Sequence, residues 1–333
     1  MSLSAKDKSK SWQQVSAKAT PYLFLLPAMI VLSLAVFWPA IQAFILSFTE
    51  FGYDITAAPS WVGLKNFQKL WGDPVFWKTL TNTLLYLVFA VPILVIAPLG
   101  LAILVNQKLK GIQWFRTAYY TPVVISMVVA GIAWKWLYTQ NGLLNQMGLW
   151  IYNSNPWLQS FLDWIYSHSS LVRSFTEWLS LSEKGIPWLT NPNLALFCVM
   201  VVTIWKGLGY YMVIYLAGLQ GIPADLYEAA SIDGSDGIQK HLDITIPLMT
   251  PYLMLVGVIS AISATKVFEE IFIMTRGEPL NSSKTIVYYI YEQAFGPNLN
   301  ISYACAMGLM LYIIIFSLSL LNLWLRKGDV GTV

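Results

Sequence analysis

Charged side chains are scarce in this chain of 333 residues, where Asp, Glu, Lys and Arg together make up 11% of the sequence. Soluble domains usually carry about 25% charged residues. With 56% hydrophobic residues and a mean hydropathy of +0.58, the chain could not cover its own surface in water. This scarcity excludes an ordinary soluble domain and indicates a polytopic membrane protein. The net charge of +3 is too small to indicate a nucleic-acid partner.

Cysteine and histidine are also rare, which argues against a disulfide framework and a metal cluster. Cys198 and Cys305 both lie in apolar stretches, where free cysteines usually fill space. His168 and His241 are too far apart in the sequence to suggest a shared ligand. We therefore expect no metal site.

The sequence has no G-x-x-x-x-G-K-S/T phosphate loop, and none of its polar segments is suited to hold ATP. It also has no paired carboxylates or histidine cluster at one membrane depth, so no catalytic residues are expected. Transport driven by ATP would need a separate polypeptide for hydrolysis. The alternative that stays open is an ion- or proton-coupled secondary transporter, which could use intramembrane carboxylates for coupling.

Long hydrophobic stretches are what the sequence has in abundance. A helix of about 20 apolar residues crosses a bilayer. Six stretches are long enough: roughly 22–48, 79–106, 116–138, 193–218, 248–271 and 303–325. The predicted fold is therefore all-α, a polytopic bundle of six transmembrane helices, with a kink expected at Pro39 in the first.

Lysine and arginine predict the orientation of this bundle in a cell (inner or plasma) membrane. They are more frequent in the N-terminal tail, at 108–116, at 240 and at 326–327 than in the loops of the opposite side. Positive loops favour the cytoplasm. We expect cytoplasmic tails at 1–21 and 326–333, a membrane domain over 22–325, an external insert at 139–192 and a cytoplasmic loop at 219–247.

The segment 227–251, "YEAASIDGSDGIQKHLDITIPLMTP", is polar although apolar stretches lie on both sides of it. Pro223 suits the first turn of a helix, where its missing N–H costs nothing, and Gly234 can end that helix. A second short helix is expected from 235 to about 243, before Pro247 opens the next span. Two such short helices would be marginal alone, so neighbouring elements must hold them.

Small and acidic side chains characterise the first of these helices. Ala229 and Ala230 would let another surface approach closely, and Glu228 could pair with a basic group. The segment is either a docking element for a cytoplasmic partner or a plain connector.

The letters EAASIDG followed by ITIP resemble the EAA loop of permease subunits in binding-protein-dependent ABC importers. In that family the loop sits in a cleft of the ATPase subunit and transmits its motion. Three departures, Ser235, His241 and Ile246, leave that role intact. The matching positions are Glu228, Ala229, Ala230, Asp233, Gly234, Gln239, Ile244 and Pro247.

Further stretches resemble the carbohydrate-type subfamily, and the six-span length resembles the first of two paired permeases. Where the family usually has T-G-G-G-P, this chain has TRGEP at 275–279, and we expect a different local turn there. The matching stretches are 61–86, 115–138 followed by GLLN at 142–145, 205–223 and 266–295.

The resemblance implies a translocation subunit of an ATP-driven importer for a carbohydrate or a related polyol or osmolyte. It implies three partners: a second permease, an ATPase dimer and an external substrate-binding protein. No cofactor is expected on this chain, because ATP and Mg²⁺ would be bound by the ATPase. The implied mechanism is alternating access, in which closure of the ATPase dimer moves the spans through the docking loops.

Polar side chains within the spans are costly and mark either structural pairs or a translocation path. Lys266 and Glu270, one helical turn apart, could form such a pair, and Lys206 could reach for the interface. Sugars present hydroxyls and apolar ring faces, which aromatic and hydroxyl side chains can bind. The candidates for the path are Asn82, Trp205, Lys206, Tyr210, Tyr211, Ser260, Ser263 and Glu269.

The external insert carries an apolar stripe at helical spacing over 157–179. We expect one or two helices there that lie across the outer face without crossing the membrane. Three interpretations stay open: packing on the ends of the spans, lying in the membrane interface, or forming part of the rim that receives the binding protein.

Overall fold

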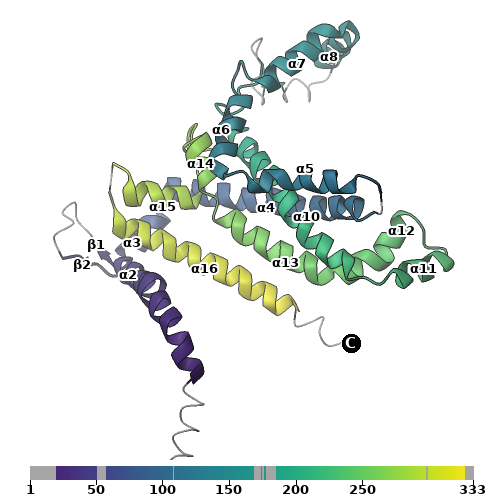
Figure 1. The fold of residues 1–333 in the computed structure, drawn as a ribbon. Helices are drawn as coiled ribbons and strands as arrows, with labels where there is room; N and C mark the ends of the chain where they lie inside the picture. The colour runs from purple at the N-terminus through teal and green to yellow at the C-terminus, as the bar shows by residue number, and fades with distance from the viewer. Residues whose placement is uncertain are drawn as a thin grey trace, which may run out of the picture. The chain divides into compact units, whose positions relative to one another are not determined.

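The computed structural model describes residues 20–50, 58–107, 109–168, 174, 176, 177, 185–297 and 299–326. Helices dominate this part of the chain (Figure 1). The strands described there, β1 (Thr49–Glu50) and β2 (Ser60–Trp61), form one short antiparallel ribbon. The predicted all-α class is confirmed. Nearly all of the two predicted tails lies outside the described residues.

The first of two compact units comprises residues 1–70 and 293–310. Its N-terminal helix spans Thr20–Leu46, and a π-helical turn, η1 (Ser33–Phe37), leads into α2 (Trp38–Leu46). The distortion predicted at Pro39 takes the form of this wider turn, because a proline ring crowds the carbonyl four residues earlier. None of the helix's most apolar stretch is buried in the chain, as expected for a surface that meets lipid or another subunit.

An aromatic cluster closes the end of this helix. Phe48 packs against Phe44 and Trp61 with ring centroids 5.3 and 5.8 Å apart, and against Phe67 of α3 (Lys65–Trp71) at 5.3 Å. The buried Asn66 amide donates hydrogen bonds to the Ser47 and Thr49 carbonyls. The last apolar helix, α16 (Ile301–Arg326), begins in this unit.

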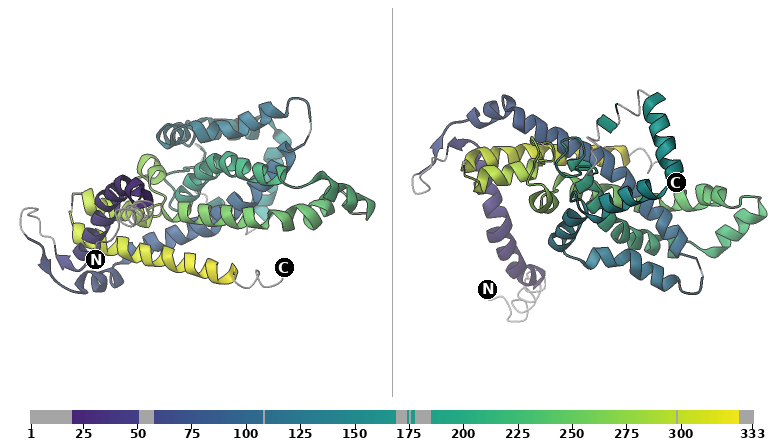
Figure 2. Two further views of the ribbon diagram at one scale, coloured as in Figure 1. Left: turned by 60° about the horizontal axis from the view of Figure 1, so that its bottom comes forward. Right: turned by 90° about the horizontal axis from the view of Figure 1, so that it is seen from above.

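The second unit, residues 71–292 and 311–333, contains the main helical core. Its long helices α4 (Pro74–Val105), α10 (Ala195–Gln220) and α13 (Ile246–Thr265) lie side by side, with α5 (Ile112–Val124) against α10 (Figures 1 and 2). Gly209 lets α10 approach the backbone of α5, the small-residue packing that membrane helices favour. The largest buried side chains of this core include Tyr86, Met212, Tyr215, Met249, Val256 and Ile271.

Each of the six predicted hydrophobic stretches falls on helical structure. Within the described residues, α16 has a shorter apolar stretch, Ile301–Ser317, and the third predicted span is interrupted. The chain is therefore a polytopic helical membrane protein, while the count of six crossings stays a prediction. The helices long and apolar enough to cross alone are Thr20–Leu46, Pro74–Val105, Ala195–Gln220 and Ile238–Thr265.

The expectation of a single helix over 116–138 is wrong. The structure has α5 and then α6 (Met127–Leu137), bent by 98° at the break between them. Ile125 is extended, and the Ser126 hydroxyl caps α6 by accepting a hydrogen bond from the Val129 amide. This cap lets a new helix start in a new direction.

The fifth predicted span, 248–271, is also placed incorrectly at both ends. Its helix begins earlier, at Ile238, and ends at Thr265. A break at 266–268 separates it from the short helix α14 (Glu269–Met274). A loop over 275–285 then leads to α15 (Ile286–Phe295).

The external insert begins with two helices, α7 (Leu143–Ser154) and α8 (Pro156–His168), which contact each other. The predicted helix over 157–179 is thus present in its first half, and residues 169–173 and 178–184 lie outside the described residues. Trp157 and Trp164 on α8 are 74% and 58% exposed. These two rings are not covered by the spans of their own chain, and all three interpretations of the stripe stay predictions.

Candidate functional site

The predicted docking segment forms a hairpin between α10 and α13 (Figure 1). Its first arm is α11 (Ala224–Ile232), which follows Pro223 as expected. The helix ends where Gly234 adopts a φ of +86°, and the Ser235 amide donates to the Ala230 carbonyl at 2.8 Å. This is the glycine-terminated helix end that the sequence predicts.

The second arm differs from the prediction of a separate short helix over 235–243. It consists of α12 (Ile238–Lys240) and a π-helical turn, η2 (His241–Thr245), that runs without a break into α13. Pro247 is the second residue after η2, as Pro39 is the second residue after η1. In both places the residue four positions before the proline lies in the π turn. The wider turn gives its carbonyl room beside the proline ring.

Side-chain hydrogen bonds tie the two arms together. The Tyr227 and Thr245 hydroxyls are 2.9 Å apart, and the Ser235 hydroxyl donates to Asp243 at 2.7 Å. The Lys240 ammonium donates to the Ser231 hydroxyl from the other arm. These contacts supply the neighbours that short helices need. The hairpin is therefore a folded element, with its two arms bonded to each other.

The exposure of the predicted docking residues divides them into two groups. Ala230 is only 8% exposed and faces the second arm, so it does not offer a surface to a partner. Ile244 is half-buried. The others, which are free to meet a partner, are Glu228, Ala229, Asp233, Gly234 and Pro247.

Two isoleucines at the tip are the features that sequence reasoning missed. Ile232 is 87% exposed and Ile238 is 80% exposed, one on each side of the turn over 233–237. Asp225 and Glu228 are exposed on the same arm as Ile232. Apolar side chains that flank a glycine turn in a polar segment were the available signal.

Replacing Gly234 by alanine should weaken the hairpin through backbone strain. A β-carbon there would meet no atom within 4 Å, so the cost comes from the positive φ, about 1–2 kcal/mol for an ordinary residue. We expect a lower thermal midpoint and a severalfold loss of import. Gly148→Ala is the matched control, because that position in α7 also has open space but no positive φ. Equal behaviour of the two variants would contradict the strain argument.

Lys206 lies on α10 at the break between α5 and α6. Its ammonium donates a hydrogen bond to the carbonyl of Ile125, the residue that ends α5. The last carbonyls of a helix have no partner within it, and they carry the negative end of the helix dipole. This contact favours the structural interpretation of Lys206, and both that role and a role in the path stay predictions.

Glu270 does not pair with Lys266 in the structure. The described residues contain no ion pair between them, Lys266 is exposed, and Glu270 is 9% exposed. The Glu270 carboxylate accepts a hydrogen bond from the Thr203 hydroxyl at 3.0 Å, and Thr203 also bonds to the fully buried Tyr86. The break at 266–268 turns α14 so that Glu270 faces α10 and α4 instead of following Lys266.

Asn82 occupies a buried position between α4 and the loop over 275–285. Its side-chain amide donates to the carbonyls of Asn281 and Lys284, both at 2.9 Å. The neighbouring Thr83 hydroxyl accepts from the Ile286 amide at 3.0 Å. Asn82 therefore holds the loop in place, and its amide hydrogens are not free for a substrate.

Two of the remaining path candidates, Tyr210 and Tyr211, contact each other edge-on with ring centroids 5.1 Å apart. Tyr211 and Ser260 are buried, and the Ser260 hydroxyl donates to the Val256 carbonyl of its own helix. Trp205 packs edge-on against Trp134, with ring centroids 5.6 Å apart. The role of these residues in a path stays a prediction. Those exposed on the surface of the chain are Tyr210, Ser263 and Glu269.

Apolar helices of spanning length, with a folded polar hairpin between two of them, indicate a polytopic membrane protein. The chain belongs to the family of binding-protein-dependent transport system inner membrane components, which it matches over residues 73–328. As a permease it is a translocation component and not the hydrolytic subunit. The membrane location and the multi-pass topology follow from the same membership.

Several relatives are similar along almost their whole length. The arabinooligosaccharide permease AraP of Bacillus subtilis (strain 168) is 33% identical, covering 97% of this chain and 94% of its own. The lactose permease LacF of Rhizobium radiobacter is 29% identical over 92% and 93%. A crystal structure of a bacterial ABC transporter that imports the acidic polysaccharide alginate has a chain with a TM-score of 0.73 at 22% identity, covering 97% and 100%.

Proposed function

We propose that this chain is the permease subunit of an ATP-driven importer for a carbohydrate or a related polyol or osmolyte. The observation that carries the proposal is the folded hairpin of α11 and α12, which has two exposed isoleucines beside its turn. Family membership supports the importer class, and the relatives named for arabinooligosaccharides and lactose support the carbohydrate class.

The proposed partners follow from the same reasoning. The hairpin docks in the ATPase dimer, which binds ATP and Mg²⁺, and a second permease completes the translocation unit. An external binding protein delivers the substrate, as in the alginate transporter solved with its periplasmic protein. In this arrangement the hairpin and both termini lie in the cytoplasm, and the insert at 139–192 lies outside.

Within the hairpin we assign different tasks to different residues. Ile232, Ile238 and Ala229 enter the partner's cleft, while Glu228 and Asp233 meet basic groups at its edge. Ala230 and Ile244 keep the two arms packed together. Because η2 runs directly into α13, a displacement of the hairpin is passed to that span without an intervening loop.

The proposal is tested by reconstituting the chain with its co-purifying subunits in proteoliposomes. We expect uptake of a neutral oligosaccharide such as arabinotriose, maltotriose or lactose that needs both ATP inside and the binding protein outside. Uptake that survives ATP depletion but collapses with a protonophore would instead support the ion- or proton-coupled secondary transporter. Complexes that import none of the saccharides offered, yet import a non-carbohydrate osmolyte, would overturn the carbohydrate class.

A further inference from the structure

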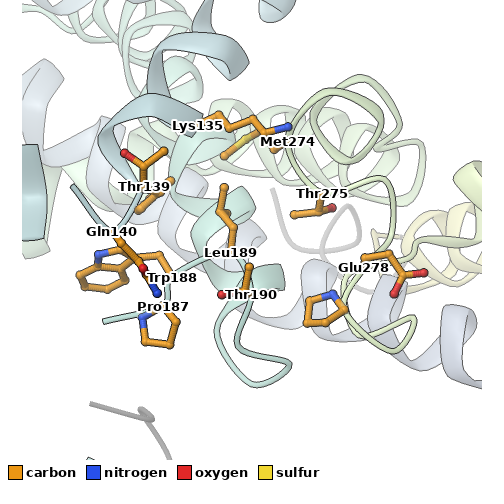
Figure 3. A pocket seen from close by; sticks show the side chains of 12 residues that line it. Lys135, Thr139, Gln140, Pro187, Trp188, Leu189, Thr190, Met274, Thr275 and Glu278 are labelled. Atoms are coloured by element: carbon orange, nitrogen blue, oxygen red, sulfur yellow. The ribbon is translucent and has the colours of Figure 1, made fainter. Parts of the chain in front are cut away.

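A cavity of about 460 Å³ opens between α6, the loop over 187–190 and the segment that follows α14 (Figure 3). Small-molecule sites usually have volumes of about 300–1,000 Å³. None of the path candidates predicted from the sequence contributes to it. Its lining residues are Lys135, Tyr138, Thr139, Gln140, Pro187, Trp188, Leu189, Thr190, Met274, Thr275, Glu278 and Pro279.

One buried side chain fixes the frame of this cavity. Asn145 is 4% exposed and donates hydrogen bonds to the Thr139 carbonyl at 3.2 Å and the Ile186 carbonyl at 3.0 Å. Its oxygen accepts from the Ile186 amide at 3.0 Å and from the Trp188 indole at 3.1 Å. A single amide thus joins the end of α6 to the loop and sets the position of the Trp188 ring.

The Trp188 ring is held as a wall of the cavity. It packs against Tyr138 with ring centroids 5.9 Å apart, and the Tyr138 hydroxyl donates to the Cys198 carbonyl at 3.2 Å. With the indole N–H committed to Asn145, the ring offers the cavity an apolar face rather than a donor. A fixed aromatic face of this kind suits the C–H side of a sugar ring.

The polar groups around that wall have unused hydrogen-bonding capacity. The structure gives no side-chain hydrogen bond to Gln140 or Thr190, and Lys135 makes only one long bond, 3.5 Å, to the Ile273 carbonyl. Glu278 stands at the rim beyond Thr275 and accepts one bond, from the Leu280 amide at 2.9 Å (Figure 3). Together they can donate and accept, as the hydroxyls of a saccharide require.

We propose that this cavity is a binding site for a neutral saccharide unit, stacked on Trp188 and hydrogen-bonded by Gln140, Thr190 and Lys135. This inference rests on the proposed function, and it specifies a neutral saccharide as the ligand of this cavity. The lining carries one cation, Lys135, and one anion, Glu278. These two charges cancel, so the cavity has no excess positive charge to attract a uronate or a phosphorylated sugar.

The test uses the intact importer complex in nanodiscs, without the binding protein. Thr139→Cys, in a Cys305→Ala background, carries a trifluoromethyl label at the cavity, and Ser160→Cys carries it on α8 as the control. We expect maltotriose or arabinotriose to shift the ¹⁹F resonance at 139 in a saturable way and to leave that at 160 unchanged. Trigalacturonate should bind more weakly than either.

Three further variants separate the parts of the site. Gln140→Ala and Thr190→Val should each weaken binding about three- to tenfold, the effect of one hydrogen bond. Trp188→Leu should abolish the shift, whereas Trp188→Phe should retain part of it. Gln146→Ala is the matched control, since Gln146 is exposed on α7 and bonds only to the Asn141 carbonyl.

The experiment distinguishes a failure of this inference from a failure of the proposed function. A complex that imports these saccharides but shows no shift at 139 overturns the cavity site alone. Equal or tighter binding of trigalacturonate overturns the selection for a neutral ligand. In a separate sample, adding the sugar-free binding protein should leave the resonance at 139 in place. A shift there would overturn the proposal, because the cavity would then be a protein contact.

Discussion

Replacing both Ile232 and Ile238 by aspartate is expected to abolish ATP-driven import and to release the ATPase from the complex. The two side chains are 87% and 80% exposed and stand together at the tip of the hairpin. A buried isoleucine contributes about 1.5–3 kcal/mol, so losing two from an interface should weaken association by about 100-fold or more. Co-purification of the ATPase and import in proteoliposomes measure the two effects.

Leu280→Asp is the matched control for this double variant. Leu280 is 78% exposed and lies in the loop over 275–285, which we place on the other side of the membrane. It should leave assembly with the ATPase unchanged. If the double variant keeps its ATPase and imports normally, the hairpin is not the docking element, whatever the family membership implies.

Because Ala230 is buried, a substitution there is not a test of docking. A tryptophan at 230 would be forced between the two arms, because Ala230 is 8% exposed and its carbonyl accepts the bond that closes the helix. Such a variant would lose activity through disruption of the hairpin itself. Substitutions at the exposed Ala229 or at the tip isoleucines report on the partner instead.

The sequence was sufficient to predict the class of fold and the first arm of the hairpin. Pro223 and Gly234 act on the backbone locally, so their effects can be read without knowing what packs nearby. The side of a short helix that faces inward cannot be predicted in this way, because distant residues decide it. In α11 the side that faces the second arm carries Tyr227 and Ser231, which bond to Thr245 and Lys240, and no local pattern distinguishes Ala229 from Ala230.

The break in the third predicted span shows another limit of sequence reasoning. Hydrophobicity continues through 116–138, and Pro122 lies inside α5 rather than at the break. The bend depends on Ser126 as a helix cap and on Lys206, which lies far away in the sequence. A long-range partner of this kind leaves no mark in a local hydrophobic pattern.

Asparagines were the least predictable residues. Asn82 was assigned to the substrate path because polar residues in membrane spans often line a path. Asn145 is the last residue of the GLLN stretch at 142–145, and the sequence indicated no role for it beyond that resemblance. Both are buried and bind backbone carbonyls of distant loops, Asn82 at 281 and 284 and Asn145 at 139 and 186. Amide side chains can bond to loop backbone groups that no water reaches, so a buried asparagine in a span can serve the fold rather than a substrate.

Lys206→Met is expected to destabilise the complex rather than to block transport selectively. Methionine keeps the length and apolar stem of lysine but leaves the Ile125 carbonyl without its donor. The contact is only partly buried, so the loss of this donor should cost about 1 kcal/mol, and the end of α5 would also lose a nearby cation. We expect a lower thermal midpoint in detergent and a reduced yield of assembled complex.

Two matched variants separate the structural role of Lys206 from a role in the substrate path. Lys206→Arg retains a cation and donors that can reach Ile125, so it should restore most of the assembly. Lys266→Met removes an exposed lysine at the end of α13 whose side chain has no ion pair among the described residues, and it should leave the midpoint unchanged. A Lys206→Met complex that assembles and melts like the wild type but imports poorly would show that the lysine acts on the substrate. Unchanged import and stability would exclude both roles, and the break between α5 and α6 would then have to be held by Ser126 alone.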